Sequence, residues 1–116
     1  MFYYLIAGPV TYNHYELISL QLDENLKGKE EIVIVSGAAQ GVDAIAKRYA
    51  EEHNLRHIEF PLETTHYARL EEMCKFVSKQ ADKMAAIVWD GKDDDTFKAF
   101  ALAEKYGIAF HMILVE

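Results

Sequence analysis

The chain is poor in cysteine and proline, with one Cys and two Pro among 116 residues. The single thiol, Cys74, excludes a disulfide within this sequence and a multi-cysteine metal site. It is typical of a protein from a reducing compartment, so we expect a cytoplasmic location. The five histidines show no metal-ligand spacing, and we expect neither a bound metal nor a cofactor.

Clustered positive charge is also missing. Twelve Lys and Arg stand against nineteen Asp and Glu, the net charge is −7, and no basic run exceeds two residues. This balance argues against nucleic-acid binding, which needs clustered cations. No apolar run reaches membrane-spanning length, and residues 1–8 lack the basic leader of a signal peptide. We therefore expect neither a nucleic-acid partner nor a membrane.

Apolar runs that suit strands alternate with segments of helical periodicity. Strands are predicted at residues 2–7, 32–36, 56–60, 84–89 and 108–115, and the longest irregular segment at residues 61–67. The helical stripes are Tyr15, Ile18, Leu22 and Leu26; Val42, Ile45, Ala46, Tyr49 and Ala50; Leu70, Met73, Val77 and Ala81; and Phe97, Phe100 and Ala101. The pattern predicts one Rossmann-like, doubly wound α/β domain over residues 1–116. Its five-stranded, mainly parallel sheet carries helices on both faces.

The stretch from Ile32 to Asp43 carries the strongest signal for a site. Four β-branched residues without alternation predict a strand buried on both faces. Gly37 and Gly41 then bracket a turn of small residues before the next helix. Such a turn lets backbone amides and a helix N-terminus approach a phosphate. It is equally typical of a tight strand-to-helix connection in which Asp43 caps the helix or lies in its first turn.

Three loops converge at the carboxyl ends of the predicted strands, where ligands collect in this architecture. They are residues 8–12, 37–43 and 90–96. The convergence follows from topology alone. Tyr12 and Trp89 lie at strand ends, where each aromatic ring could stack on a base or pack in the core.

The segment Ser36-Gly37-Ala38-Ala39-Gln40-Gly41-Val42-Asp43, followed by Trp89-Asp90-Gly91-Lys92 and Thr96, resembles the SLOG superfamily. This Rossmann-like group includes the Smf/DprA and LOG proteins. The resemblance is greatest to the small stand-alone branch related to YspA and YpsA, which is common in bacteria and phages. That branch usually reads GGARGVD after a strand, then an R-N-x-x-M helix and a DGKSxGT loop.

The chain departs from the branch pattern at four positions. Ala38 and Gln40 replace the second Gly and the Arg of GGARGVD, Leu70 replaces the Asn, and Asp95 replaces the Gly before Thr96. Arg69 and Met73 match the Arg and Met of the helix motif. The loss of the Arg at position 40 removes a cation with bidentate geometry and weakens the case for a highly charged phosphate.

The resemblance implies that a nucleotide or nucleotide-derived molecule binds between the loops. The candidate ligand-binding residues are Gly8, Thr11, Tyr12, Gly37, Ala38, Gln40, Gly41, Asp43, Arg69, Asp90, Gly91, Lys92, Asp95 and Thr96. For the run Asp93–Asp95 three interpretations remain open: a helix-capping acidic turn, direct acceptance of ribose hydroxyls, or a Mg²⁺-assisted phosphate site.

Two related enzyme classes supply the alternative function. Ile6-Ala7-Gly8-Pro9 is similar to the signature of nucleoside 2-deoxyribosyltransferases, and the LOG proteins are phosphoribohydrolases. Both use a catalytic Glu shortly after the later loop, where this chain has Ala99 and no carboxylate until Glu104. We therefore favour binding without catalysis and name no catalytic residue, although Asp43 or Asp90 could substitute in an enzyme acting on N-glycosidic bonds. A third hypothesis is an assembly module that forms a homodimer or larger homo-oligomer through the apolar Phe76 and Phe97.

The position of Arg69 near the start of a predicted helix leads to a specific prediction about its partner. A cation at a helix N-terminus is electrostatically disfavoured, so an anionic partner should offset that cost. Because Arg69 matches the Arg of the family's helix motif, the resemblance implies that it faces the cleft and contacts the ligand or the Asp43 carboxylate. The alternative is an exposed arginine that pairs with Glu71 or Glu72.

Overall fold

The computed structural model describes residues 1–61 and 65–116 and contains five strands alternating with four helices. In chain order the elements are β1 (Phe2–Ala7), α1 (Tyr15–Asn25), β2 (Ile32–Gly37), α2 (Val42–Glu52), β3 (Arg56–Phe60), α3 (His66–Ser78), β4 (Asp82–Trp89), α4 (Asp94–Lys105) and β5 (Phe110–Leu114). The strands form one sheet in the order β3-β2-β1-β4-β5, and all four pairings are parallel. The Rossmann-like α/β prediction is confirmed.

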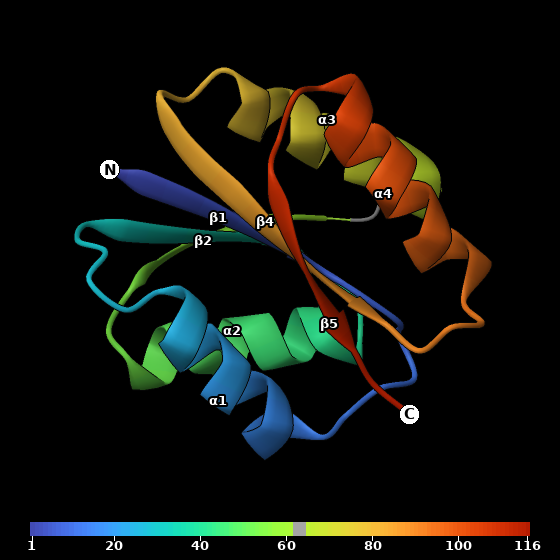
Figure 1. Cartoon of the computed structure of the whole chain (residues 1–116), viewed down its shortest axis with the longest axis horizontal. Helices are drawn as coiled ribbons and strands as arrows, with labels where there is room; N and C mark the ends of the chain where they lie inside the picture. The colour runs from blue at the N-terminus through green and yellow to red at the C-terminus, as the bar shows by residue number, and fades with distance from the viewer. Residues whose placement is uncertain (62–64) are drawn as a thin grey trace.

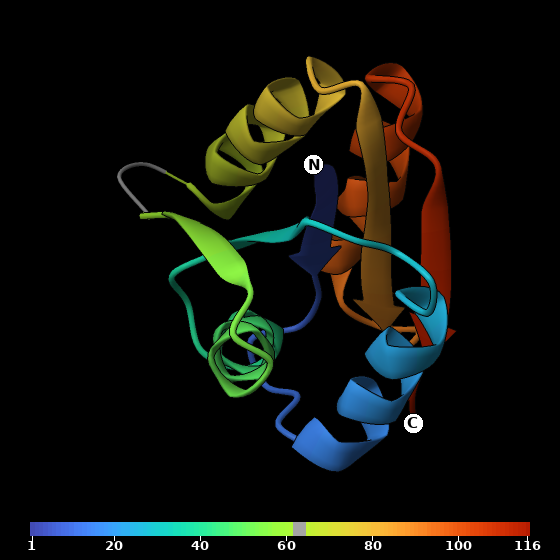
Figure 2. The ribbon, with the colours of Figure 1, turned by 90° about the vertical axis from the view of Figure 1, so that its left-hand side faces the viewer.

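The helices form two layers, one on each face of the sheet (Figure 1). Helices α1 and α2 cover one face, and α3 and α4 cover the other, as the turned view also shows (Figure 2). The chain runs outward from β1 through β2 to β3, then returns to place β4 on the opposite side of β1. Strand order therefore reverses between β1 and β4, and a crevice opens outside their carboxyl ends.

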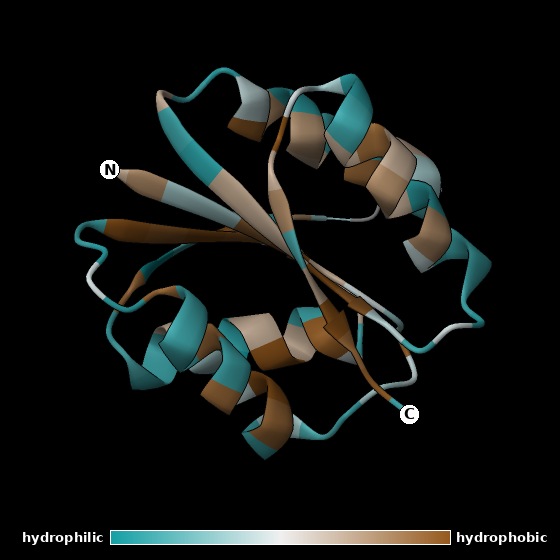
Figure 3. Ribbon diagram, viewed as in Figure 1, coloured by the Kyte–Doolittle hydropathy of each residue, from teal (hydrophilic) through white to brown (hydrophobic). Residues whose placement is uncertain are grey.

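Two apolar clusters hold the layers together. One joins Tyr4, Ile6 and Ile34 of the sheet to α1 and α2, and the other joins Leu5, Val35 and Ile87 to α3 and α4. Adjacent residues of a strand point to opposite faces, so a sheet covered on both sides needs unbroken apolar runs. The continuous apolar colouring of β2 in Figure 3 is this run. None of the described helices has the length and apolar character needed to cross a bilayer.

The structure corrects several predicted details of the elements. Strand β4 begins two residues earlier than expected, and β5 is shorter at both ends. Ala81 is exposed and follows α3 rather than belonging to its stripe. In α4, Phe97 is 58% exposed and Ala101 is exposed, so the expected stripe is wrong for these two residues, whereas Phe100 packs against the apolar cluster under α3 and α4. The buried face consists of Thr96, Ala99, Leu102 and Ala103, because small side chains let this helix approach the sheet closely.

The irregular segment predicted at residues 61–67 is shorter than expected. Helix α3 already begins at His66, so His66 and Tyr67 are helical and do not lie in the loop. Its N-cap is Thr65, whose hydroxyl accepts a hydrogen bond from the amide of Ala68 at 3.0 Å. Such a cap satisfies one of the free donors of the first turn. Residues 62–64 lie outside the described part of the chain.

Gly41 fixes the loop after β1 against the start of α2. Its φ of +69° is a conformation that favours glycine, and a Cβ there would lie 2.4 Å from the carbonyl oxygen of Pro9. The same carbonyl accepts a hydrogen bond from the amide of Val42 at 3.2 Å. Two loops of the crevice therefore meet through their backbones.

We expect Gly41→Ala to lower the free energy of unfolding, measured by urea denaturation, by at least about 2 kcal/mol, because it combines an unfavourable φ with a backbone clash. Gly107→Ala is the matched control: its φ is +68°, but no heavy atom lies within 4 Å of its added Cβ. Gly107→Ala should lower the free energy of unfolding by only about 1 kcal/mol. Equal losses in the two variants would contradict a steric role for Gly41.

Candidate functional site

A small cleft lies at the crevice between β1 and β4. Its described walls come from the end of β1 and the loop after it, the first turn of α2, the first half of α3 and the start of α4. The lining residues are Ala7, Gly8, Val10, Asp43, His66, Arg69, Leu70, Met73, Asp93, Asp95 and Thr96. Segments from four separate parts of the chain meet here, as expected for a ligand site in a doubly wound sheet.

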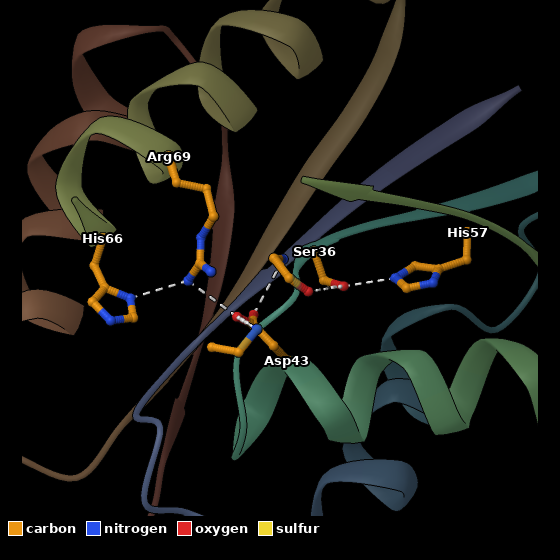
Figure 4. Close-up of polar contacts among 7 residues, drawn as sticks. Ser36, Asp43, His57, His66 and Arg69 are labelled. Carbon is orange, nitrogen blue, oxygen red and sulfur yellow. Dashed lines mark hydrogen bonds and ion pairs between the residues drawn. The ribbon is translucent and has the colours of Figure 1, made fainter. Parts of the chain in front are cut away.

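An ion pair between Arg69 and Asp43 joins two residues that line this cleft (Figure 4). The Nη2 atom of Arg69 donates a hydrogen bond to Oδ2 of Asp43 at 3.2 Å, and the two side chains are 9% and 8% exposed. Arg69 comes from the first turns of α3 and Asp43 from the first turn of α2. The expectation that Arg69 contacts the Asp43 carboxylate is confirmed; Glu71 instead accepts hydrogen bonds from Lys105 and Tyr106.

The Asp43 carboxylate also organises the loop before it. Its Oδ1 accepts a hydrogen bond from the Gly37 amide at 3.3 Å, and its Oδ2 accepts one from the Ala39 amide at 3.2 Å. Burial raises the pKa of Asp43 above the ordinary aspartate value, while the Arg69 guanidinium and these two amides oppose that rise. The carboxylate therefore takes a place that a bound anion could occupy in this turn.

Gly37 is required by the ion pair rather than by its backbone conformation. A Cβ at this position would lie 2.5 Å from Cζ of Arg69 and 2.7 Å from Oδ2 of Asp43. Any side chain at position 37 would push the two charged groups apart. The absence of a side chain at Gly37 therefore leaves the space that the Arg69 guanidinium occupies.

Two nitrogens of Arg69 remain without a partner among the described residues. These are Nε and Nη1, both buried, whereas Nη2 also lies 3.2 Å from Nδ1 of His66. A buried donor without an acceptor costs about 1–3 kcal/mol. The guanidinium of this cleft-lining residue thus has two donors that the described residues leave without an acceptor.

The start of α4 is capped by its own carboxylates. Asp93 is the N-cap, and its Oδ2 accepts hydrogen bonds from the amide and the hydroxyl of Thr96. The Oδ1 atom of Asp90 accepts from the amides of Lys92 and Asp93, both at 2.9 Å. The amides of Asp93 and Lys92 lower the pKa of Asp90. This geometry bears out the capping interpretation for Asp93, while Asp95 stays exposed beside Lys98.

Five of the candidate residues line the cleft, namely Gly8, Asp43, Arg69, Asp95 and Thr96. Gly37 abuts the ion pair, and Asp90 organises the α4 loop. Tyr12 packs against the cluster under α1 and α2, on the other face of the sheet. Trp89 packs against Phe97 and Phe100. The remaining candidates, Thr11, Ala38, Gln40, Gly41, Gly91 and Lys92, do not line the described cleft.

Sequence reasoning placed His66 in a loop and did not assign the apolar lining residues Val10, Leu70 and Met73 to the site. His66 was expected in a loop, yet it lines the cleft beside Arg69 from the first turn of α3. Thr65 as an N-cap was the available signal for this start of the helix. A second pair, Ser36 Oγ and His57 Nε2, lies 2.7 Å apart beneath the Gly37 turn, but Ser36 is fully buried. Among the described residues, no group of three or more His, Cys, Asp and Glu side chains is placed to hold a metal ion.

We expect Arg69→Met to lower the free energy of unfolding by about 3–5 kcal/mol at pH 7, because it leaves the Asp43 carboxylate buried without its cation. The double variant Asp43→Asn/Arg69→Met should lose less than the sum of the single losses. Urea denaturation of the wild type, Asp43→Asn, Arg69→Met and the double variant measures the coupling energy between the two side chains. Arg48→Met, which removes an exposed arginine paired with Glu52, is the control and should change little.

The loss in Arg69→Met should also depend on pH. A carboxyl whose pKa is raised by folding contributes stability below its unfolded pKa of about 3.9 and loses it as the pH rises through the folded pKa. Removal of Arg69 raises the pKa of Asp43 further, because the guanidinium opposes its rise. The loss of unfolding free energy in Arg69→Met should therefore become smaller as the pH falls toward 4. A deficit independent of pH would show that lost packing, rather than the carboxylate charge, causes it.

Comparison with known proteins identifies the family. No curated protein and no solved structure matched the chain. The family model for YAcAr, described as the YspA, cpYpsA-related SLOG family, matches residues 4–67. This range covers β1 to β3, including the Gly37–Asp43 turn, and ends within the first turn of α3. The chain belongs to the YspA- and cpYpsA-related SLOG family.

Proposed function

We propose that this protein binds a nucleotide-derived small molecule in the cleft between β1 and β4 and leaves the ligand chemically unchanged. The observation that carries the proposal is Arg69. Its guanidinium is buried, held by Asp43, and has two nitrogens without an acceptor among the described residues. A ligand that accepts hydrogen bonds from these nitrogens would satisfy them, and this supports binding at Arg69.

Family membership supports the class of ligand. The SLOG family suggests either binding of a nucleotide-related ligand or chemistry at a glycosidic bond. The position of the cleft, at the reversal of strand order, agrees with both. The choice between them depends on whether a carboxylate is available to react.

The carboxylates near the cleft favour binding over catalysis. At the position where the related enzymes place a Glu, Ala99 is 2% exposed and packs in the core against the sheet. Asp43 is held by Arg69 and two amides, whereas Asp90 accepts two amide hydrogen bonds through Oδ1 and does not line the described cleft. A nucleophile or general acid needs an unengaged oxygen directed at the substrate. Asp95 is the exposed carboxylate of the described lining and would be the candidate acid of the alternative, an enzyme acting on N-glycosidic bonds.

Binding can be measured by isothermal titration calorimetry against nucleosides and nucleotides. We expect the wild type to bind at least one of them, and Asp43→Asn/Arg69→Gln to lose at least tenfold in affinity, about 1.4 kcal/mol. The double variant avoids an unpaired buried charge. Arg48→Gln, on the exposed side of α2, should bind like the wild type. Equal binding by the double variant would rule out Arg69 as the contact, and absence of binding by the wild type would reject the proposed function.

We expect no release of free base when the protein is incubated with nucleosides or nucleoside 5′-monophosphates and the products are separated by chromatography. The reason is that Ala99 cannot supply the carboxylate of the related enzymes. Base release that disappears in Asp95→Asn but persists in Asp94→Asn would overturn binding without catalysis. It would then assign the acid role to Asp95.

A further inference from the structure

The charge of the cleft does not suit a phosphate. Its described lining contains one arginine and three carboxylates, Asp43, Asp93 and Asp95. Asp43 already balances the charge of Arg69, and the other two carboxylates remain as excess negative charge. Like charges at short range repel, and partial burial strengthens that repulsion. A phosphate in this position would therefore lie near two further carboxylates, one of which caps α4 while the other lies 4.0 Å from Nζ of Lys98.

Several backbone donors at the two helix starts, where such folds usually hold phosphate, are engaged within the protein. At the start of α2, Gly37 and Ala39 donate to Asp43, and Val42 donates to the carbonyl of Pro9. At the start of α4, the amide and hydroxyl of Thr96 donate to Asp93. Helix N-termini bind anions through free amides and the helix dipole. In both helices an aspartate of the chain already takes that role.

Among the buried side-chain donors, Nε and Nη1 of Arg69 have no partner in the part of the chain that the structure describes. Since Asp43 neutralises the guanidinium, these nitrogens need a hydrogen-bond acceptor rather than a negative charge. Base carbonyls, ring nitrogens and ribose oxygens are such acceptors. The exposed carboxylate of Asp95 adds an acceptor for a hydroxyl or amino group of the ligand.

The size of the cleft allows only one end of a ligand to enter. It encloses about 70 Å³, whereas pockets that bury a whole drug-sized ligand hold roughly 300–1,000 Å³. The remainder of a nucleotide would lie outside the cleft. Apolar contacts from Val10, Leu70 and Met73 line the part that is enclosed.

We propose that the end of the ligand that enters the cleft is uncharged, a base or a ribose held by Arg69, and that any phosphate stays outside. This inference rests on the proposed function and names its ligand class: nucleosides, and nucleotides bound through their nucleoside part. Binding energy then comes from hydrogen bonds and apolar contact. Phosphate groups weaken binding through repulsion from Asp93 and Asp95.

The test compares adenosine and guanosine with their 5′-mono-, di- and triphosphates by calorimetry at two salt concentrations. Affinity for at least one series should be highest for the nucleoside and fall with each phosphate, and nucleoside affinity should not change with salt. Affinity that rises with each phosphate and weakens in salt would overturn the inference while leaving the proposed function standing. Absence of binding by every compound would overturn both.

A pair of charge variants tests where the phosphate lies. Asp95→Asn removes a cleft carboxylate, whereas Asp94→Asn removes the same charge from an exposed residue of the same turn that does not line the described cleft. Asp95→Asn should improve monophosphate affinity relative to the nucleoside by at least about threefold, and Asp94→Asn by less. Equal improvement in both variants, or none, would contradict repulsion by the cleft carboxylates.

Discussion

The Arg69–Asp43 ion pair is the contact on which the organisation of this cleft depends. It joins the first turn of α2 to the beginning of α3 across the carboxyl end of the sheet. It also explains Gly37, because any Cβ at that position would collide with both charged groups. Removing either partner would leave an uncompensated buried charge, which costs far more than an exposed pair contributes. One interaction thus sets the position of the α3 helix start, the course of the Gly37 turn and the presentation of two arginine nitrogens.

The two helix starts at the crevice follow one rule, in which an aspartate of the chain accepts hydrogen bonds from nearby amides. Asp43 does so from within the first turn of α2, and Asp93 does so as the N-cap of α4. Either arrangement stabilises its helix, because a carboxylate interacts favourably with the positive end of the helix dipole. The same arrangement engages the amides of Gly37, Ala39 and Thr96, which are then not free to bind a ligand. Local helix stability and phosphate binding therefore compete for the same donors, and in this chain the helices use them.

The strands and the two-layer arrangement could be predicted because unbroken apolar runs such as Ile32–Val35 suit only a sheet covered on both faces. The Arg69–Asp43 contact followed from the unfavourable position of a cation at a helix start, together with the match of Arg69 to the family's helix motif. The buried stripe of α4 could not be predicted from hydrophobicity, since the small residue Ala99 faces the sheet while Phe97 is exposed. Tyr12 packs against the cluster under α1 and α2, and the Gly37 amide donates to Asp43. Both contacts depend on tertiary packing and turn geometry, which the periodicity of the sequence does not encode.

Two departures from the usual family pattern have different structural consequences. Gln40 stands in place of an arginine, but it is exposed and does not line the described cleft, so its effect on the charge there is indirect. Asp95 stands in place of a glycine, and it lines the cleft directly. The first change removes a distant cation, whereas the second adds a carboxylate where a ligand would approach Arg69. Of the two, Asp95 therefore acts more directly on the charge of the cleft, because it lines the cleft and the interaction between charges weakens with distance. A cleft that keeps a neutralised arginine and gains a carboxylate retains its capacity to donate hydrogen bonds while it loses its preference for anions.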